Sequence, residues 1–318
     1  MKTISMYSYK GGSGRSTACV NLIYFLADTL QVTEKNPIIV VDTDIDSAGL
    51  SFLLNSENKK VNLYLQDVLN GENKGKNVFG EIEDNPFFAS LLAVGKYFKL
   101  PERAVLLLPS KVKSDSNAFD LSSKTLVEFR AIKKLSERYK CSAVFYDCPS
   151  GTQLLAEWSI SESDNVVCCL RPTYQFIRGT VESVTSMSLT SANPKLPKKN
   201  FIICPNAVSR KQNVFRGLQF PECIRDTLQN QVIGAIKENL SNAGVEGHNI
   251  IDSLLRDSPE EFKTGRPEHL RNEQIIGIPE VERFKWFETC LGVLEQDKLI
   301  DDERLAVERY KYLASLIK

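Results

Sequence analysis

Short, continuously apolar runs recur along the chain, and segments in which apolar residues return every three or four positions lie between them. The apolar runs are Ile4–Tyr9, Ile38–Asp42, Ala104–Pro109, Ala143–Asp147, Val166–Leu170, Phe201–Pro205 and Ile275–Ile278. Strands covered by helices on both faces have continuous runs of this kind, whereas strands with one wet face alternate. Helical spacing follows the first run, over residues 19–30, and recurs over residues 122–139. The pattern therefore predicts an α/β protein, a doubly wound, mostly parallel sheet with helices on both faces.

A few segments break this rhythm. Residues 55–60, 71–76 and 110–120 are polar and predict loops. A long, charged, helical pattern over residues 206–273 predicts an insertion between the last two strands, and residues 284–318 predict a helical C-terminus. Because we find no internal repeat and no clear linker, we expect residues 1–318 to form a single domain.

Composition excludes several classes of protein. The 318 residues hold 40 basic and 40 acidic side chains, so no global basic field indicates nucleic acid binding. The 8 cysteines lack metal-type spacing and the 2 histidines leave little room for a histidine metal site, which favours free thiols in a reducing compartment. There is no signal-peptide pattern after Met1 and no run of about 18 apolar residues, as a spanning helix needs. We expect a cytoplasmic protein.

The strongest chemical feature is a glycine-rich turn between the first strand and the first helix. It consists of Tyr9, Lys10, Gly11, Gly12, Ser13, Gly14, Arg15, Ser16 and Thr17. Phosphate binding needs backbone amides that converge at a helix N-terminus, and glycines let the backbone come close to the phosphate oxygens. Ser16 stands where the hydroxyl of a P-loop ligates Mg²⁺. The segment from Gly11 to Thr17 therefore predicts a phosphate-binding loop, with a glycine-rich turn that binds nothing as the alternative.

This turn resembles the deviant Walker A motif of the MinD/ParA family, K-G-G-x-G-K-[ST]-T. The resemblance implies a P-loop NTPase fold with ATP and Mg²⁺ as cofactors. It also implies that Lys10 is the signature lysine, which reaches across a dimer interface to the partner's nucleotide. Arg15 stands where the family usually has lysine, and Tyr9 replaces the leading glycine of an ordinary P-loop. Arginine is bulkier than lysine but binds phosphate, so the departure bears on the rate of hydrolysis more than on binding.

Two later strands end in carboxylates that resemble the family's switch motifs. The second strand runs into Asp42-Thr43-Asp44, and the resemblance implies that Asp42 supports Mg²⁺ through water while Asp44 orients the attacking water. Asp147 begins a D-x-P-x-G segment and would hold a Mg²⁺-bound water. The implied metal site therefore comprises Ser16, Asp42 and Asp147, and the implied catalytic residues are Lys10 and Asp44.

Adenine recognition has two candidates. The strand-ending Asn206 and the late loop with Pro279 resemble the family's contacts to the base, and an amide both donates to and accepts from a purine edge. Each segment is also a common turn sequence, so an ordinary turn is the open alternative.

The resemblance implies an ATP-driven dimerisation switch that forms a homodimer on ATP binding, engages a protein partner and hydrolyses ATP slowly. Partition, positioning, or service in a multi-gene bacterial defence module would fit. Alternatives are a nucleotide-stabilised scaffold with little turnover, and an iron–sulfur or metabolic relative, for which Cys148 has no evident second cysteine. Non-specific DNA binding stays possible, although neutrality weakens it. The acidic start of residues 301–318 disfavours binding to an anionic membrane.

Overall fold

The structure is a computed structural model that describes residues 1–71, 85–112, 122–190, 198–210, 214–215, 218–245, 248–271, 273–286 and 289–317. Residues 55–60 form turns and irregular chain, as predicted. Most of the other two predicted loops, residues 72–76 and 113–120, lies outside the described residues.

The strands of the main sheet follow the order β10-β7-β6-β1-β5-β2-β4-β3. Their bounds are β1 Lys2–Tyr7, β2 Ile38–Asp42, β3 Leu92–Ala93, β4 Val105–Leu108, β5 Ala143–Asp147, β6 Asn165–Leu170, β7 Asn200–Pro205 and β10 Asn249–Ile251. β2 pairs in parallel with β4 and β5, β7 pairs in parallel with β6 and β10, and the short β3 is antiparallel to β4. The predicted mostly parallel α/β sheet is therefore confirmed.

The chain divides into two compact units. Unit 1 consists of residues 1–5, 27–149 and 153–163, and unit 2 of residues 6–26, 150–152 and 164–318. In unit 1 the side chains of β2 and β5 are fully buried, as their unbroken apolar runs require. The ring of Phe129 in helix α5 lies 5.4 Å from Tyr146 in β5 and 5.9 Å from Trp158 in α6. The helices of this unit are α2 Gly49–Leu54, α3 Leu65–Leu69, α4 Pro86–Ser90, α5 Ser123–Arg138 and α6 Leu154–Glu162.

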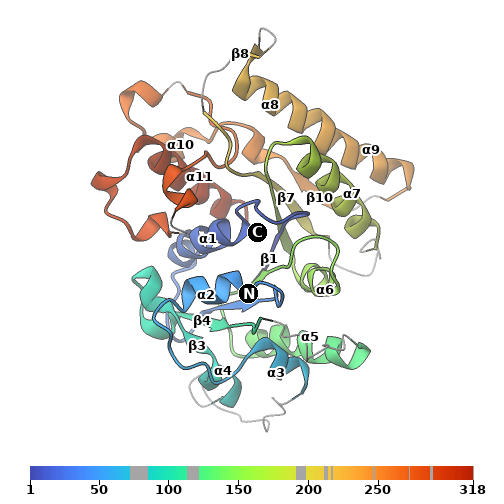
Figure 1. Ribbon diagram of the computed structural model, residues 1–318, viewed down its shortest axis with the longest axis vertical. Helices are drawn as coiled ribbons and strands as arrows, with labels where there is room; N and C mark the ends of the chain where they lie inside the picture. Colours follow the sequence, from blue (N-terminus) through green and yellow to red (C-terminus); the bar gives the residue numbers. More distant parts are fainter. Residues whose placement is uncertain are drawn as a thin grey trace. The chain divides into compact units, whose positions relative to one another are not determined.

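The remaining helices of the described residues lie in unit 2. They are α1 Arg15–Thr29, whose last turn belongs to unit 1, α7 Tyr174–Thr190, α8 Phe220–Leu228, α9 Ala235–Asn242, α10 Glu260–Lys263 and α11 Asp301–Ser315. A π-helical turn, Gln229–Gly234, joins α8 to α9, so that the two make one helical run beside α7 (Figure 1). No described helix is both long and apolar enough to cross a membrane.

Single turns of 3-10 helix lie between these elements. Their bounds are Gly95–Phe98, Glu102–Ala104, Ser253–Leu255, Glu268–Leu270, Glu282–Lys285, Leu291–Val293 and Gln296–Lys298. Most of them lie between residues 253 and 298, so the predicted helical C-terminus consists of short turns followed by α11.

One predicted strand is wrong. Residues 275–278 are buried but form no strand, and the neighbouring Pro279 makes only an isolated bridge to Val208. Their apolar side chains are buried in unit 2, but their backbone does not form the continuous series of hydrogen bonds to a neighbouring strand that defines a strand. The segment 206–273 also differs from expectation, because besides α8, α9 and α10 it holds the three-residue β10 and a separate hairpin of β8 Val214–Phe215 and β9 Leu218–Gln219. That residues 1–318 are one P-loop domain stays a prediction.

Candidate nucleotide-binding site

The glycine-rich turn lies in unit 2, between β1 and the first residue of α1. Gly12 and Gly14 have φ angles of 79° and 77°, in the left-handed region that side chains disfavour. A Cβ on Gly14 would lie 2.5 Å from Nδ2 of Asn206, so glycine is required there by space as well as by conformation. The turn leads directly into α1, whose first turn carries no acidic residue. The dipole and the first backbone amides of a helix favour an anion at its N-terminus.

Asn206 supports this turn from the end of β7. Its side-chain Nδ2 donates to the carbonyl of Ser13 at 2.9 Å and to that of Gly14 at 3.1 Å, and its Oδ1 accepts from the amide of Ala207 at 2.9 Å. The side chain is buried, with 5% of the residue exposed. Asn206 therefore contacts the glycine-rich turn directly, and its contact with a base stays a prediction.

The residues that open α1 point their polar groups in different directions. Arg15 is 8% exposed, and its Nη1 donates to Oγ of Ser8 at 3.4 Å, at the end of β1. Ser16 is half-buried, whereas Thr17 is buried and its carbonyl accepts from Nδ2 of Asn21 at 2.9 Å. The side chain of Arg15 is thus buried against Ser8, whereas that of Lys10 is exposed.

Lys10 is exposed and lies against α7. Its Nζ donates to Oε1 of Gln175 at 2.8 Å. The ring of Tyr9 packs on the same helix one turn further on, because a Cβ on Gly179 would lie only 2.0 Å from that ring. Together with neighbouring residues they line a surface hollow of about 660 Å³. Lys10 is therefore an exposed residue that lines this hollow, and its role at a partner's nucleotide stays a prediction.

Two carboxylates lie side by side in unit 1. Asp42 and Asp147 end the adjacent strands β2 and β5 as register partners, and both are fully buried. Burial, and next the charge of Asp147, raises the pKa of Asp42 to about 7, although hydrogen bonds from Ser51 oppose the shift. A divalent cation or its bound water relieves such repulsion, so these residues fit the predicted support of Mg²⁺.

Ser51, on α2, was missed by the sequence analysis. Its backbone amide and its Oγ donate to Oδ2 of Asp42 at 2.9 and 2.6 Å. The amide of Ser110 donates to the same Oγ at 3.0 Å, which directs the hydroxyl hydrogen of Ser51 toward Asp42. No motif marks Ser51, because it comes near Asp42 only once α2 has packed.

The two other carboxylates of the Asp42 loop differ in exposure. Asp44 is half-exposed, its Oδ1 accepts from the amide of Ser47 at 3.3 Å, and its carbonyl accepts from the amide of Ala48 at 2.7 Å. Asp46 is exposed and accepts from Nε2 of Gln153 at 3.1 Å. Asp44 is therefore anchored and still accessible, which fits the predicted orientation of a water.

Pro279 lies beside the segment that follows β7. The amide of Val208 donates to the carbonyl of Ile278 at 3.0 Å, and the amide of Ile278 donates to that of Pro205 at 2.8 Å. Unit 2 therefore brings together the glycine-rich turn, Asn206 and the segment at Pro279, whereas Asp42, Asp44 and Asp147 lie in unit 1.

No group of three or more His, Cys, Asp or Glu side chains in the described part of the chain has the arrangement of a self-sufficient metal site.

The chain matches a family model and is similar in fold to several solved structures. A family model described as an AAA domain matches residues 1–197. The structure of a variant of McdA from Cyanothece in complex with ATP has a TM-score of 0.56 at 17% identity, over 100% of this chain and 97% of that one. MinD, in the MinC:MinD cell division complex of Aquifex aeolicus, has a TM-score of 0.55 at 15% identity over 99% and 96%.

A metabolic enzyme has a similar fold. Cobyrinic acid a,c-diamide synthase from Mycobacterium smegmatis, with an ATP analogue and magnesium, has a TM-score of 0.57 at 15% identity over 99% and 93% of the two chains. At these identities the likenesses establish the fold alone. No curated protein matches the chain.

Proposed function

This chain belongs to the AAA-domain family of MinD/ParA-type ATPases, and we propose that it is a switch that binds Mg²⁺-ATP and dimerises on it. The observation that carries the proposal is the turn before α1, in which Gly12 and Gly14 take left-handed conformations at a helix N-terminus. A turn of this kind at a helix N-terminus suits an anion, because the helix dipole and the first backbone amides favour negative charge there.

Each part of the site has a role in this proposal. The amides of residues 11–17 and the side chain of Arg15 hold the phosphates, and Ser16, with Asp42 and Asp147 through water, supports Mg²⁺. Mg²⁺-ATP, when bound, supplies the phosphoanhydride that is hydrolysed. Asp44 orients the water, Asn206 and Pro279 lie on the side of the base, and Lys10 reaches a second copy of the chain.

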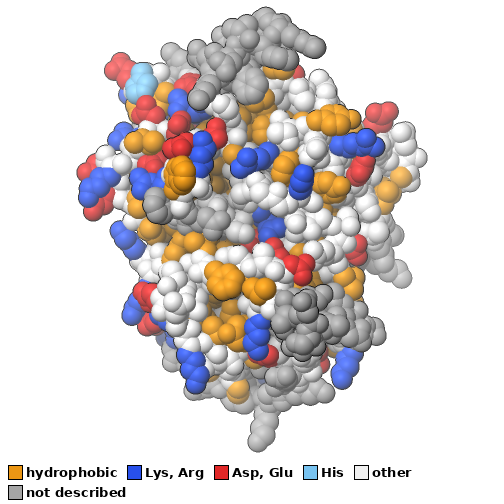
Figure 2. Space-filling model, in the orientation of Figure 1, with side chains coloured by type: hydrophobic (Ala, Val, Ile, Leu, Met, Phe, Trp, Pro, Cys, Tyr) orange, Lys and Arg blue, Asp and Glu red, His pale blue; other side chains and the backbone are white. Residues whose placement is uncertain are grey.

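A protein is the favoured partner. One of the similar structures is MinD bound to MinC, and the surface charge of this chain does not favour DNA. Figure 2 shows basic and acidic side chains interspersed on the drawn face. Lys285 is one of the basic side chains of this chain that pair with carboxylates, here those of Glu280 and Glu282. Mixed charge weakens non-specific attraction to phosphate backbones.

The alternative, a nucleotide-stabilised scaffold with little turnover, is favoured by one observation. Arg15 is bulkier than the usual lysine and is already buried against Ser8, so its adjustment during hydrolysis is restricted. Steady-state release of phosphate by the purified protein distinguishes the two functions: turnover supports the switch, and dimerisation on ATP without turnover supports the scaffold.

We expect saturating Mg²⁺-ATP to raise the melting temperature of the protein, since a ligand that binds only the native state stabilises it by about 2.7 kcal/mol at 100 times its Kd. Thermal denaturation with and without Mg²⁺-ATP is the measurement. Gly14→Ala should abolish the shift, because the new Cβ meets Asn206. Gly244→Ala is the matched control. Its φ of 66° imposes similar backbone strain on alanine, but the new Cβ would have no neighbour within 4 Å. A wild-type protein that does not respond to ATP would refute the proposal.

We expect Asp44→Ala to accumulate as an ATP-bound dimer, provided that the wild type hydrolyses ATP. The carboxylate orients water and does not anchor phosphate, so its loss should spare binding while it slows turnover. Size-exclusion chromatography with ATP measures the dimer. Asp46→Ala, two residues away on the same loop, is the control and should cycle like the wild type. An Asp44→Ala protein that stays monomeric while the wild type dimerises would contradict the assigned role.

A further inference from the structure

Arg309 is the largest fully buried side chain of the described residues, and it lies on α11, outside the matched family region. Its Nε donates to the carbonyl of Gly277 at 3.0 Å. Nη1 donates to Oγ of Ser258 at 2.7 Å, and Nη2 donates to the carbonyls of Leu254 and Arg256 at 2.9 and 3.0 Å. Burial lowers the pKa of Arg309 to about 10, so the side chain keeps its charge at neutral pH. A buried guanidinium with four backbone and hydroxyl acceptors fixes the segments that carry them.

The Gly277 segment is in turn locked to the end of β7. The amide of Gly277 donates to the carbonyl of Leu254 at 2.7 Å, and the amide of Ile278 donates to the carbonyl of Pro205 at 2.8 Å. Gly277 has a φ of 62°, and a Cβ there would lie 2.3 Å from the carbonyl oxygen of Pro205. The two backbones are therefore as close as they can come, and a shift of the Gly277 segment displaces Pro205.

Asn206 is the next residue, and it extends this contact to the phosphate loop. Its backbone amide donates to the carbonyl of Leu170 at 2.8 Å, while its side chain donates to the carbonyls of Ser13 and Gly14. A continuous series of contacts thus runs within unit 2 from Arg309 through Gly277 and Pro205 to Asn206 and the loop.

We propose that Arg309 and Asn206 are positioning residues that act in series on the phosphate loop, so that the C-terminal helix α11 forms part of the nucleotide-binding framework. Neither residue needs to touch the phosphates to have this effect. Arg309 fixes the position of Pro205 through the Gly277 segment. Asn206, the next residue, then fixes the carbonyls of the loop through its side-chain hydrogen bonds, and these carbonyls orient the loop amides. The inference rests on the proposed binding of ATP, but it also makes a claim about the protein without nucleotide.

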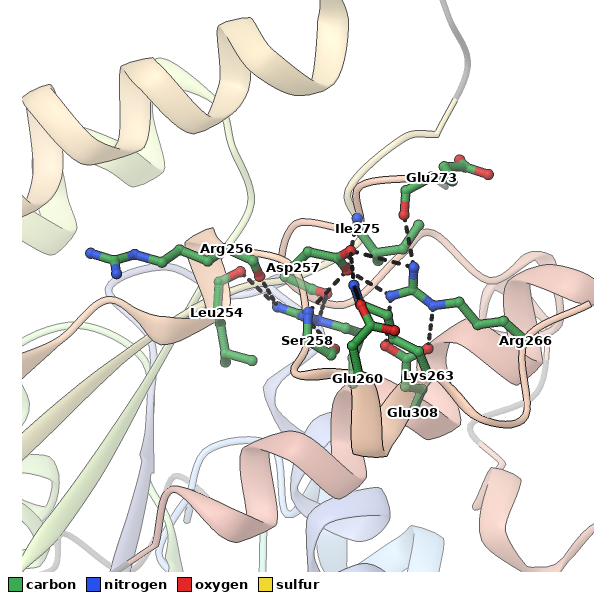
Figure 3. A network of polar contacts seen from close by, with 12 residues as sticks. Leu254, Arg256, Asp257, Ser258, Glu260, Lys263, Arg266, Glu273, Ile275 and Glu308 are labelled. Atoms are coloured by element: carbon green, nitrogen blue, oxygen red, sulfur yellow. Dashed lines mark hydrogen bonds and ion pairs between the residues drawn. The ribbon is translucent and has the colours of Figure 1, made fainter. Parts of the chain in front are cut away.

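A second ion network beside Arg309 supplies the control. Arg266 donates to Glu308, to Asp257 and to the carbonyl of Glu273, and Lys263 also pairs with Asp257. Figure 3 shows Asp257, Arg266 and Glu308 next to Leu254, Arg256 and Ser258, the residues that accept from Arg309. Arg266 is as well buried, with 1% of its side chain exposed, but it donates to the side chains of Asp257 and Glu308 and to the carbonyl of Glu273. Of the two arginines, only Arg309 donates to the carbonyl of Gly277, the segment that contacts Pro205. Its replacement should lower stability without a specific effect on the loop.

The test compares Asn206→Ala, Arg309→Lys, their double variant and Arg266→Lys. The affinities of ATP and of inorganic tripolyphosphate, which has no base, are measured by calorimetry. Each single change at Asn206 or Arg309 should weaken both ligands about tenfold, because the loop amides lose their orientation. The double variant should be no weaker than Asn206→Ala alone, since residues in series are not additive. Arg266→Lys should bind both ligands within about twofold of the wild type.

A measurement without nucleotide tests the positioning of the loop separately from the binding of ATP. Hydrogen exchange of the amide of Ala18, which donates to the carbonyl of Gly14 at 2.9 Å, should quicken in Asn206→Ala and in Arg309→Lys but not in Arg266→Lys. If Arg309→Lys fails to fold, Ser258→Ala removes one hydrogen bond of the same guanidinium and should show the same effects at about twofold to threefold.

Three results would overturn the inference: additive effects in the double variant, a loss of ATP affinity with unchanged tripolyphosphate affinity, or unchanged exchange at Ala18. If instead the wild type binds neither ligand, the proposed function fails, and the exchange experiment by itself still decides whether Arg309 and Asn206 position the loop.

Discussion

Replacing Arg15 with alanine should weaken ATP binding about ten- to a hundredfold, which corresponds to the roughly 1.5–3 kcal/mol of one charge-assisted hydrogen bond to phosphate. Arg15 is the first residue of α1 and its guanidinium is buried toward Ser8, in the turn that holds the anion in our proposal. Calorimetry with Mg²⁺-ATP on dilute, monomeric protein measures the loss. Arg15→Lys restores the residue usual in the family and should bind ATP nearly as well as the wild type.

Replacing Lys10 should have a different effect. Lys10 is exposed and bonded to Gln175, outside the turn, so Lys10→Ala should leave ATP binding by the monomer nearly intact but impair dimerisation and turnover. Gln175→Ala removes the same hydrogen bond while it keeps the ammonium, and should therefore dimerise like the wild type. If Arg15→Ala and Lys10→Ala lose binding equally, and neither selectively changes the oligomeric state, the role of Lys10 at the partner's nucleotide is wrong.

Asp42→Asn should stabilise the nucleotide-free protein at pH 8, on the order of 1–3 kcal/mol, and remove a pH dependence that the wild type shows. In the folded protein the pKa of Asp42 is raised from 3.8 to about 7, by burial first and by Asp147 second. The folded state therefore binds a proton that the unfolded state has released, and stability falls as pH rises from about 4 to about 7. Urea unfolding in EDTA at several pH values measures this slope.

The same substitution should reduce the dependence of ATP binding on Mg²⁺, because it removes one of the two charges that support the cation. Asp46→Asn is the matched control, since Asp46 is exposed and its neutralisation should alter neither stability nor the slope. A wild-type protein whose stability is constant between pH 5 and pH 8 would show that the pKa of Asp42 is not raised in the folded state.

These expectations differ in how far they depend on the three-dimensional structure. The sequence analysis predicts the bounds of β2 and β5 correctly to the residue, because an unbroken apolar run that ends in a carboxylate is a local pattern. The turn before α1 is also local: Gly12 and Gly14 allow the left-handed conformation, and the strand and helix on either side follow from periodicity. Features of this kind depend on neighbours in the chain, so composition and spacing are sufficient to predict them.

Features that depend on distant partners were decided only by the tertiary structure. The hydrogen bond from Asn206 to Ser13 joins residues 193 positions apart. No sequence motif indicates the hydrogen bonds from Ser51 to Asp42 and from Arg309 to Gly277. Residues 275–278 show the reason. Their apolar side chains correctly indicate burial, but a strand also needs a neighbouring backbone in register, and here Leu254 and Pro205 accept only single amides. Burial is a property of a side chain, whereas a hydrogen-bond partner is a property of the packed chain.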